Sequence, residues 1–387
     1  MSIRLGICGA GAFATGFIPL FKAHPLVDEV VLADLDEEKL KAKAEQFEIK
    51  RTCRSLDELC EMDDLDAIAI FTQNWMHGPQ AAQALRAGKH VYSAVPPGIT
   101  VDELRDLVAA VEESGKIYML GETSYYRPGA IYCRQRLAKG DFGHIVYCEG
   151  QYYHDWDHGL YDVIKWRAGE RWREVAGFPP MHYPTHSTGF VMGITKAYAT
   201  HVSCIGFIDR HEDGIYNPDV NRWHNPYSDQ TALLKMSDGS VCRINEFRRI
   251  GHPGMEGGSI YGTEGCYEES AAGIRWLTKD QSRVEDLTDL LAPRGIPADD
   301  GSGTWTAMSR VHDIARLPRE FIGLPNGHGG SHQFLVDDFV KAANAGEHPP
   351  INVWWAVRFM MPGLIAHESA MRGGELLEVP DLGDPAV

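Results

Sequence analysis

The stretch Ile3-Arg4-Leu5-Gly6-Ile7-Cys8-Gly9-Ala10-Gly11-Ala12-Phe13-Ala14 decides the fold of this 387-residue chain. Its first seven residues are typical of a buried β-strand, and residues 12–23 predict a helix directly after it. Between them lies the pattern G-x-G-x-x-A, in which the first glycine permits a tight turn and the second lets the backbone approach a pyrophosphate. The alanine lets the helix pack closely on the sheet, and the helix N-terminus attracts the anion. The residues predicted to bind a dinucleotide are Gly9, Gly11, Ala12, Phe13 and Ala14.

A carboxylate at the end of the second predicted strand indicates which dinucleotide binds. Asp34 follows the run Glu29-Val30-Val31-Leu32-Ala33 and lies 20 residues after Ala14. A carboxylate at this position binds the ribose hydroxyls and repels a 2′-phosphate. Leu35 and Asp36 follow without an adjacent Arg, so we expect NAD rather than NADP. A glycine turn beside an unrelated surface Asp is the alternative interpretation.

The order of strands and helices predicts an α/β fold with two domains. Strands are expected at 3–9, 29–33, 66–71, 89–93 and 116–120, and helices at 12–23, 36–47, 78–87 and 101–114. Such alternation predicts a parallel sheet with helices on both faces, a Rossmann domain spanning residues 1–122. Residues 123–387 should form an α+β domain on an antiparallel or mixed sheet, because aromatic, alternating stretches follow at 144–153, 229–236, 240–248 and 258–261. We expect a long loop at 280–330 and helices at 332–345 and 353–371 that pack back on the first domain.

Composition excludes several classes of function. The chain is 44% hydrophobic and 24% charged, as globular proteins are, and its formal charge of −17 argues against nucleic acid and membrane surfaces as partners. Eight cysteines without C-x-x-C spacing argue against a zinc ribbon or a disulfide framework and favour reduced thiols in a cytoplasmic enzyme. We see neither a signal peptide nor an apolar run approaching the ~20 residues that cross a bilayer.

The segment Met181-His182-Tyr183-Pro184-Thr185-His186 is the strongest candidate for proton transfer. Imidazole and phenol groups serve as general acids and bases. Pro184 suits the first turn of a helix starting near Tyr183, and the helix dipole there favours a neutral His186 that can accept a proton. We therefore predict His186 as the general base, with Tyr183 and His182 beside it. A His182/His186 metal pair would need continuous helix and a third ligand, so we expect no metal site.

Further motifs resemble the Gfo/Idh/MocA oxidoreductase family. They are Thr72-Gln73-Asn74 with His77, Gly88-Lys89-His90-Val91, and Trp166-Arg167 followed by Gly177 and His186. The resemblance implies a Rossmann domain, a second domain with a large, open, mainly antiparallel sheet, and a nicotinamide cofactor. It also implies sugar or polyol substrates, and homodimers or homotetramers formed through that sheet. The further cofactor-binding residues it implies are Thr72, Asn74, His77, Val95, Pro96, Glu122, Trp166 and Arg167.

Two departures from the family pattern bring the chain nearer to one branch. Ala94-Val95-Pro96 replaces the family's Glu-Lys-Pro, and His182 replaces the Asp four residues before the catalytic His. Tyr183–His186 and Gly327-His328-Gly329-Gly330 resemble the NAD-dependent glycosidases of glycoside hydrolase family 109, which also lack the Lys. Those enzymes oxidise the sugar at C3, eliminate the aglycone, add water and reduce again.

These observations lead to one preferred function and two alternatives. The chain is predicted to be an NAD-dependent oxidoreductase that oxidises a secondary hydroxyl, at C3, of a sugar or glycoside. The alternatives are a glycosidase that recycles NAD and an inactive NAD-binding regulator. The predicted substrate contacts are Tyr126, Arg127, His154 and His328, with the aromatic run Tyr152–His158 as a carbohydrate platform or as sheet packing.

Overall fold

The computed structural model describes residues 2–384, except for the side chain of Arg167, and the chain divides into two compact units. Unit 1 comprises Met1–Ile131, Leu290–Val357 and Leu382–Val387, and unit 2 comprises Tyr132–Asp289 and Arg358–Asp381. The predicted boundary at residue 122 therefore differs from the observed division, because residues 123–131 and 290–357 cluster with the N-terminal segment.

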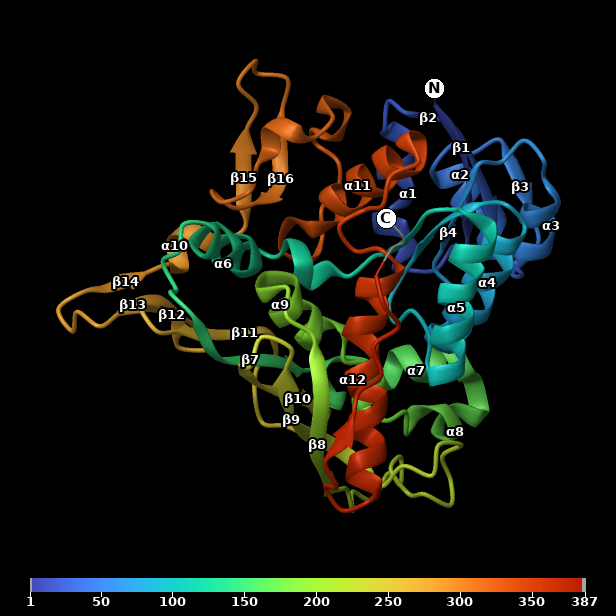
Figure 1. Ribbon diagram of the computed structural model, residues 1–387. Helices are drawn as coiled ribbons and strands as arrows, with labels where there is room; N and C mark the ends of the chain where they lie inside the picture. Colours follow the sequence, from blue (N-terminus) through green and yellow to red (C-terminus); the bar gives the residue numbers. More distant parts are fainter. Residues whose placement is uncertain (1, 385–387) are drawn as a thin grey trace. The chain divides into compact units, whose positions relative to one another are not determined.

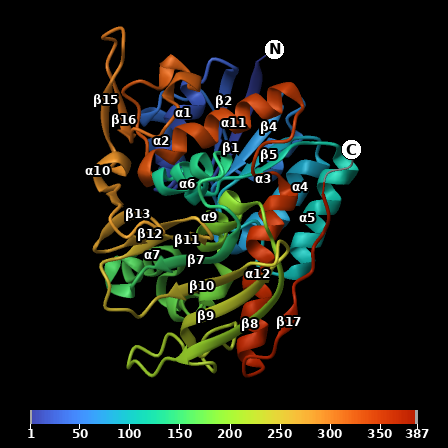
Figure 2. The ribbon, with the colours of Figure 1, turned by 60° about the vertical axis from the view of Figure 1, so that its left-hand side comes forward.

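Unit 1 contains a six-stranded parallel sheet in the order β3-β2-β1-β4-β5-β6, which confirms the predicted Rossmann fold. Its strands are β1 (Ile3–Cys8), β2 (Val27–Ala33), β3 (Arg51–Cys53), β4 (Ala67–Ile70), β5 (His90–Ser93) and β6 (Tyr118–Leu120). Figure 2 labels four of these strands, β1, β2, β4 and β5. β1 and β4 lie beside each other and are buried along most of their lengths, as central parallel strands are. The chain order reverses between them, and ligands bind at such a switch point in this class of sheet.

Unit 1 includes the helices α1 (Ile18–Ala23), α2 (Glu37–Gln46), α3 (Leu56–Glu61), α4 (His77–Arg86), α5 (Val101–Ser114) and α11 (Ser331–Ala345). Three of them begin at side-chain caps that the sequence supplies. Asp36, Ser55 and Thr100 each accept a hydrogen bond from a backbone N–H in the first turn of α2, α3 and α5. The single helix predicted for residues 12–23 is wrong: a 3₁₀ turn, Ala14–Gly16, precedes α1. Gly16 and Pro19 are the residues of this segment that disfavour continuous helix.

Unit 2 is built on a nine-stranded, mostly antiparallel sheet in the order β14-β13-β12-β11-β7-β10-β9-β8-β17 (Figure 1). Its strands are β7 (Ile145–Tyr153), β8 (Ala199–Ile208), β9 (Tyr227–Met236), β10 (Val241–Phe247), β11 (Met255–Gly262), β12 (Gly265–Ser270), β13 (Gly273–Thr278), β14 (Val284–Asp286) and β17 (Leu377–Glu378). β7 and β10 form the parallel pair, and the other pairs are antiparallel. The predicted large, mainly antiparallel sheet is confirmed.

One face of this sheet is covered by α9 (Thr185–Thr195), which packs on β7, β10 and β11. Two glycines allow neighbouring elements to pack closely against the backbone at the start of α9. A Cβ on Gly150 of β7 would lie 2.4 Å from the Ser187 carbonyl oxygen, and a Cβ on Gly363 would lie 2.2 Å from the Met181 carbonyl oxygen. The backbone that carries the predicted base is therefore held by contacts that only glycine permits.

The remaining elements include a hairpin that the sequence did not predict. They are α6 (Pro128–Ala138), α7 (Leu160–Ala168), α8 (Trp172–Ala176), α10 (Thr288–Leu291), α12 (Val353–Met371), β15 (Arg294–Pro297) and β16 (Thr304–Met308). The long loop predicted at 280–330 is wrong in part, because β15 pairs with β16 within it. Gly301 and Gly303, both with positive φ, lie between these two strands. Within residues 2–384, no helix is long and apolar enough to cross a bilayer.

Candidate active site

The glycine-rich turn of unit 1 has the shape that a dinucleotide requires. Gly9 has φ +99°, and a Cβ there would lie 2.7 Å from the Phe71 carbonyl oxygen, so only glycine fits. A Cβ on Gly11 would meet no atom within 4 Å. Space of this kind beside a Rossmann turn is where a pyrophosphate approaches the backbone. The buried Oδ1 atom of Asn74 also has no hydrogen-bond partner among the described residues. These features fit a bound dinucleotide.

Asp34 lies at the end of β2, where the ribose carboxylate was predicted. Its Oδ2 accepts a hydrogen bond from the Ala10 backbone N–H (2.8 Å), and its Oδ1 accepts one from Asp36 (2.9 Å). Lys39 also lies 2.9 Å from Oδ1. The carboxylate is thus joined directly to the glycine-rich turn. The ammonium group of Lys39 is a neighbour that the sequence interpretation did not foresee, although Lys39 stands only five residues along the chain.

The residues after β4 and β5 form one hydrogen-bonded group around His77. Its Nδ1 lies 3.1 Å from the Pro96 carbonyl oxygen, and its Nε2 lies 3.1 Å from the Thr72 carbonyl oxygen. Val95 and Pro96 are joined by a cis peptide bond. His77 therefore ties two strand ends together and is buried, a structural role beside the cofactor role predicted for it.

His328, predicted as a substrate contact, lies beside the glycine-rich turn. Its Nδ1 is 2.8 Å from Nε2 of His332, and its ring packs edge-on against Phe13, with ring centroids 5.7 Å apart. His332 stacks on Phe17 at 4.2 Å, and burial, reinforced by His328, lowers the pKa of His332 to about 3. The neutral imidazole of His332 thus holds the Gly-His-Gly-Gly run next to the predicted cofactor loop.

Glu122 and Arg127 flank the short 3₁₀ turn Thr123–Tyr126 after β6, and Tyr126 is its last residue. Glu122 is buried and caps this turn, because its Oε1 accepts a hydrogen bond from the Ser124 N–H at 2.8 Å. The Tyr126 hydroxyl donates to Asp338, which also pairs with Arg316 at 2.7 Å. Tyr126 is thus part of a buried polar network, while its predicted contact with substrate, like that of Arg127, stays a prediction.

In unit 2, the predicted proton-transfer segment, residues 181–186, forms a 3₁₀ turn and the start of α9. The turn comprises Pro180–His182, and α9 begins at Thr185, two residues later than predicted. Pro184 immediately precedes α9, and its carbonyl oxygen accepts hydrogen bonds from the Ser187 and Thr188 N–H groups. His186 is therefore in the first turn of the helix, as predicted, and its side chain is buried.

His182 lies outside α9 and so does not form a helical i, i+4 pair with His186. Its ring packs edge-on against His367, with centroids 4.9 Å apart. Burial, followed by the nearness of His367, lowers the pKa of His182 well below its usual value, and burial lowers the pKa of His367 to about 4. Both imidazoles are therefore neutral near pH 7.

A row of four side chains on the α9-covered face of the sheet supports this segment. Sheet register places Gln230 of β9 opposite Glu246 of β10, Glu246 opposite Tyr152 of β7, and Tyr152 opposite Glu256 of β11. Gln230 accepts a hydrogen bond from the Met181 N–H at 3.2 Å. The row therefore begins beneath residue 181. Its other members, Tyr152, Glu246 and Glu256, contact residues between 183 and 187.

Three side chains of unit 2 enclose His186. The Oε1 atom of Glu256 lies 3.6 Å from His186 Nδ1. The rings of Tyr152 and Tyr183 lie 4.9 Å and 5.3 Å from the imidazole, centroid to centroid. The Tyr152 hydroxyl lies 2.9 Å from Nδ1 of His154, which was predicted to contact substrate. A carboxylate and two aromatic rings around a buried imidazole form an arrangement suited to general base chemistry.

Glu246 joins this cluster to a buried arginine. It accepts a hydrogen bond from the Ser187 hydroxyl (2.5 Å) through Oε1 and pairs with Arg248 (3.1 Å) through Oε2. The Arg248 guanidinium lies over the Tyr152 ring, 4.8 Å from its centroid. Burial raises the pKa of Glu246 to about 7, although Arg248 opposes this rise. A carboxyl group with a pKa near neutrality thus contacts Ser187, the residue next to the predicted base.

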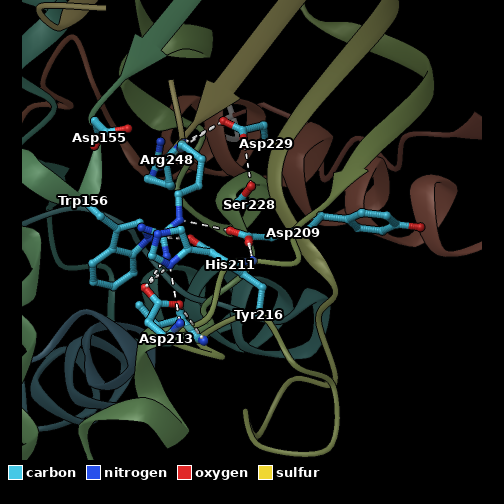
Figure 3. Close-up of polar contacts among 12 residues, drawn as sticks. Asp155, Trp156, Asp209, His211, Asp213, Tyr216, Ser228, Asp229 and Arg248 are labelled. Atoms are coloured by element: carbon cyan, nitrogen blue, oxygen red, sulfur yellow. Dashed lines mark hydrogen bonds and ion pairs between the residues drawn. The ribbon is translucent and has the colours of Figure 1, made fainter. Parts of the chain in front are cut away.

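The strand ends next to this row are held by an acidic network (Figure 3). Asp229 accepts hydrogen bonds from the backbone N–H groups of Arg248 (3.0 Å) and Arg249 (3.1 Å), and the Ser228 hydroxyl also donates to it. Asp209 pairs with Arg249 at 3.0 Å, and Asp213 pairs with the same guanidinium. These bonds fix the end of β10, and with it the position of the buried Arg248.

Sequence reasoning missed Glu246 and Glu256, although strand alternation carries a signal for both. Because alternate residues of a strand face the same side, Glu246 faces the same side as the buried Cys242 and Ile244. Likewise, Glu256 faces the same side as the buried Ile260. The strand predicted at 258–261 began too late to include Glu256. Trp166 lies in α7 and is 67% exposed, and the side chain of Arg167 is outside the described residues, so their predicted cofactor contacts stay predictions.

Comparison with known proteins agrees with this architecture. Residues 3–122 match the Gfo/Idh/MocA model, described as "Oxidoreductase family, NAD-binding Rossmann fold". A "Glycosyl hydrolase family 109 protein" of Saccharopolyspora erythraea is 24% identical over 404 aligned residues, covering 98% of this chain and 83% of that protein.

Two solved structures share the fold over the whole chain. A levoglucosan dehydrogenase in complex with NADH and levoglucosan has a TM-score of 0.74 at 19% identity, covering 98% of this chain and 100% of its own. The scyllo-inositol dehydrogenase of Lactobacillus casei, with bound NAD(H) and scyllo-inositol, has a TM-score of 0.71 at 15% identity, covering 98% and 99%. At these identities the likeness shows the fold alone.

Proposed function

We propose that this chain, whose residues 3–122 belong to the Gfo/Idh/MocA NAD-binding Rossmann family, is an NAD-dependent oxidoreductase acting on a secondary hydroxyl of a sugar or glycoside. The observation that carries the proposal is the buried His186 enclosed by Glu256, Tyr152 and Tyr183. The open space at Gly11 and the carboxylate of Asp34 support NAD as the cofactor.

In the proposed alcohol oxidation, the hydride goes to the cofactor and the proton goes to side chains of the protein. When bound, NAD⁺ supplies the acceptor for the hydride that leaves carbon, so the alcohol becomes a ketone and NADH is formed. His186 takes the hydroxyl proton, because a departing hydride would otherwise leave a protonated carbonyl. Tyr183 hydrogen-bonds the same oxygen. Val95 cannot transfer a proton, so this work falls on the His186 cluster.

The proposal predicts turnover that depends on His186. Purified protein incubated with NAD⁺ and a panel of glycosides and free sugars should yield NADH and a keto sugar, identified by mass spectrometry. His186→Asn should lower kcat at least 100-fold, since general base catalysis contributes about 10²–10⁴-fold, and should leave NAD⁺ affinity unchanged. His348→Asn, a change far along the chain, serves as the control. Absence of product from every pyranoside would refute the proposal.

A second candidate is a glycosidase that recycles its NAD⁺. The similarity along 98% of the chain to a glycosyl hydrolase family 109 protein favours it. In this reaction, oxidation at C3 acidifies the C2 proton, the aglycone is eliminated, water adds and the ketone is reduced again. Aglycone should then be released without net NADH, and the product should carry solvent deuterium at C2. A plain dehydrogenase shows neither result.

We also propose that the chain forms a homodimer through the open face of the nine-stranded sheet. Four apolar side chains on neighbouring strands are exposed there: Ile205, Phe207, Leu233 and Val241. Exposed apolar side chains gathered on one sheet face are typical of protein–protein contacts. A second copy presents the same surface, which satisfies the symmetry of a two-fold interface.

A further inference from the structure

We propose that Glu256 is the positioning residue for His186, holding the ring by Nδ1 so that Nε2 is the atom that accepts the substrate proton. This inference rests on the proposed function. It assigns a role to a carboxylate outside every motif that the sequence displays.

The fold brings the two side chains together from distant segments. His186 stands in the first turn of α9, and α9 packs on β7, β10 and β11. Glu256 lies on β11, opposite Tyr152 of β7, on the covered face of the sheet. Its Oε1 is 3.6 Å from His186 Nδ1, and both side chains are largely buried, with 13% and 7% of their surfaces exposed. Catalytic hydrogen bonds are often this long in the absence of substrate and shorten when it binds.

The contact with Glu256 determines which nitrogen of the His186 ring carries the proton. A carboxylate beside Nδ1 favours a proton on that nitrogen, which leaves the lone pair on Nε2. After Nε2 takes the substrate proton, the same carboxylate stabilises the imidazolium. Helix N-termini disfavour a cation, so His186 in the first turn of α9 needs such a neighbour to serve as a base.

Within unit 2, the other polar groups near His186 are already engaged elsewhere. Tyr152 already hydrogen-bonds His154, and Glu246 is engaged by Ser187 and Arg248. His182, at the position where the family has an Asp, is neutral and packs against His367. The charged and titratable groups that face His186 within unit 2 are Glu256, Glu246, Arg248, His154, Tyr152 and Tyr183.

The test is Glu256→Gln, which keeps the side-chain shape and removes the charge. We expect kcat to fall about 10–100-fold with KM nearly unchanged, the size of effect seen when a carboxylate that orients a metal-bound histidine is removed. We expect the acid limb of the kcat profile to move about 1 pH unit lower, because an uncharged neighbour no longer favours imidazolium. Glu256→Asp should restore part of the rate. The exposed Glu264→Gln is the matched control.

A second measurement does not depend on turnover. In ¹⁵N-histidine NMR of the full chain, the His186 signals, assigned with His186→Asn, should report the Nδ1–H tautomer in the wild type. In Glu256→Gln they should shift toward the Nε2–H tautomer. An unchanged tautomer, or a rate loss with an unmoved acid limb, would overturn the role of Glu256. Wild-type protein that turns over no sugar would instead overturn the proposed function, with the tautomer result standing by itself.

Discussion

At the scale of single residues, the chain buries several ionisable groups around one helix start. Glu246 is fully buried, receives a hydrogen bond from Ser187 and pairs with Arg248. A buried carboxyl group avoids charge unless its partners offset the lost hydration. Here burial dominates, which raises the pKa of Glu246 from 4.5 to about 7. The protonation state of this residue should therefore change in the range where enzymes operate.

This raised pKa predicts a pH dependence of stability. Between about pH 4.5 and 7, the folded protein holds the Glu246 proton more tightly than the unfolded chain does. The free energy of unfolding should therefore fall as pH rises through this window and level off above pH 7. Within this window the free energy of unfolding should fall by at most about 1.4 kcal/mol per pH unit. Urea denaturation at several pH values would measure it.

Glu246→Gln provides the comparison, because glutamine cannot titrate. The difference in unfolding free energy between wild type and this variant should change across the window. The exposed Glu264→Gln should follow the wild-type curve. Parallel curves for wild type and Glu246→Gln would show that Glu246 has an ordinary pKa.

At the scale of elements, the position of α9 depends on glycines beneath it. Gly150 of β7 faces the Ser187 carbonyl oxygen, and Gly363 of α12 faces the Met181 carbonyl oxygen. In both cases the nearest atom is a backbone carbonyl oxygen, which cannot move away from an added Cβ as the end of a flexible side chain can. The first turn of α9, which carries His186, is therefore located by close backbone packing as well as by hydrogen bonds.

Gly150→Ala should accordingly harm both stability and turnover. The new methyl group would lie 2.4 Å from the Ser187 carbonyl oxygen, so the helix start must shift. We expect a loss of roughly 1–3 kcal/mol in unfolding free energy, the usual result of overpacking, together with a lower kcat. Gly251→Ala is the control, since its methyl group would meet no atom within 4 Å. Equal stability of the two variants in denaturant titrations would contradict this account of the packing.

At the scale of the whole molecule, the open face of the nine-stranded sheet determines the expected assembly. Leu233 of β9 is 53% exposed and lies opposite Ser203 of β8 and Arg243 of β10. Leu233→Lys should convert the proposed dimer to monomer, because a lysine buried in the interface would lose its hydration. Light scattering after size exclusion would measure the mass. Val284→Lys, on the sheet-edge strand β14, should leave the dimer intact, and a monomeric wild type would refute the proposal.

The sequence predicted the parts of the fold that depend on local patterns. The strands before Gly9 and Asp34 are apolar runs, and α12 at Val353–Met371 has the predicted bounds. β3 (Arg51–Cys53) and β8 (Ala199–Ile208) escaped prediction. The first is only three residues long, and the second mixes polar and apolar residues on both faces. Their pairing with neighbouring strands, and not their own propensity, makes them strands.

By itself the sequence determined the Rossmann domain, its glycine-rich turn and the candidate base, because each is encoded within a few consecutive residues. Gly9 stands where φ is positive, and Pro184 stands directly before α9. Only the tertiary structure decided what surrounds His186. Glu246, Tyr152 and Glu256 become neighbours through the register of β10, β7 and β11. Which strands pair, and with what offset, follows from burial of a whole sheet face, and no local pattern of residues records it.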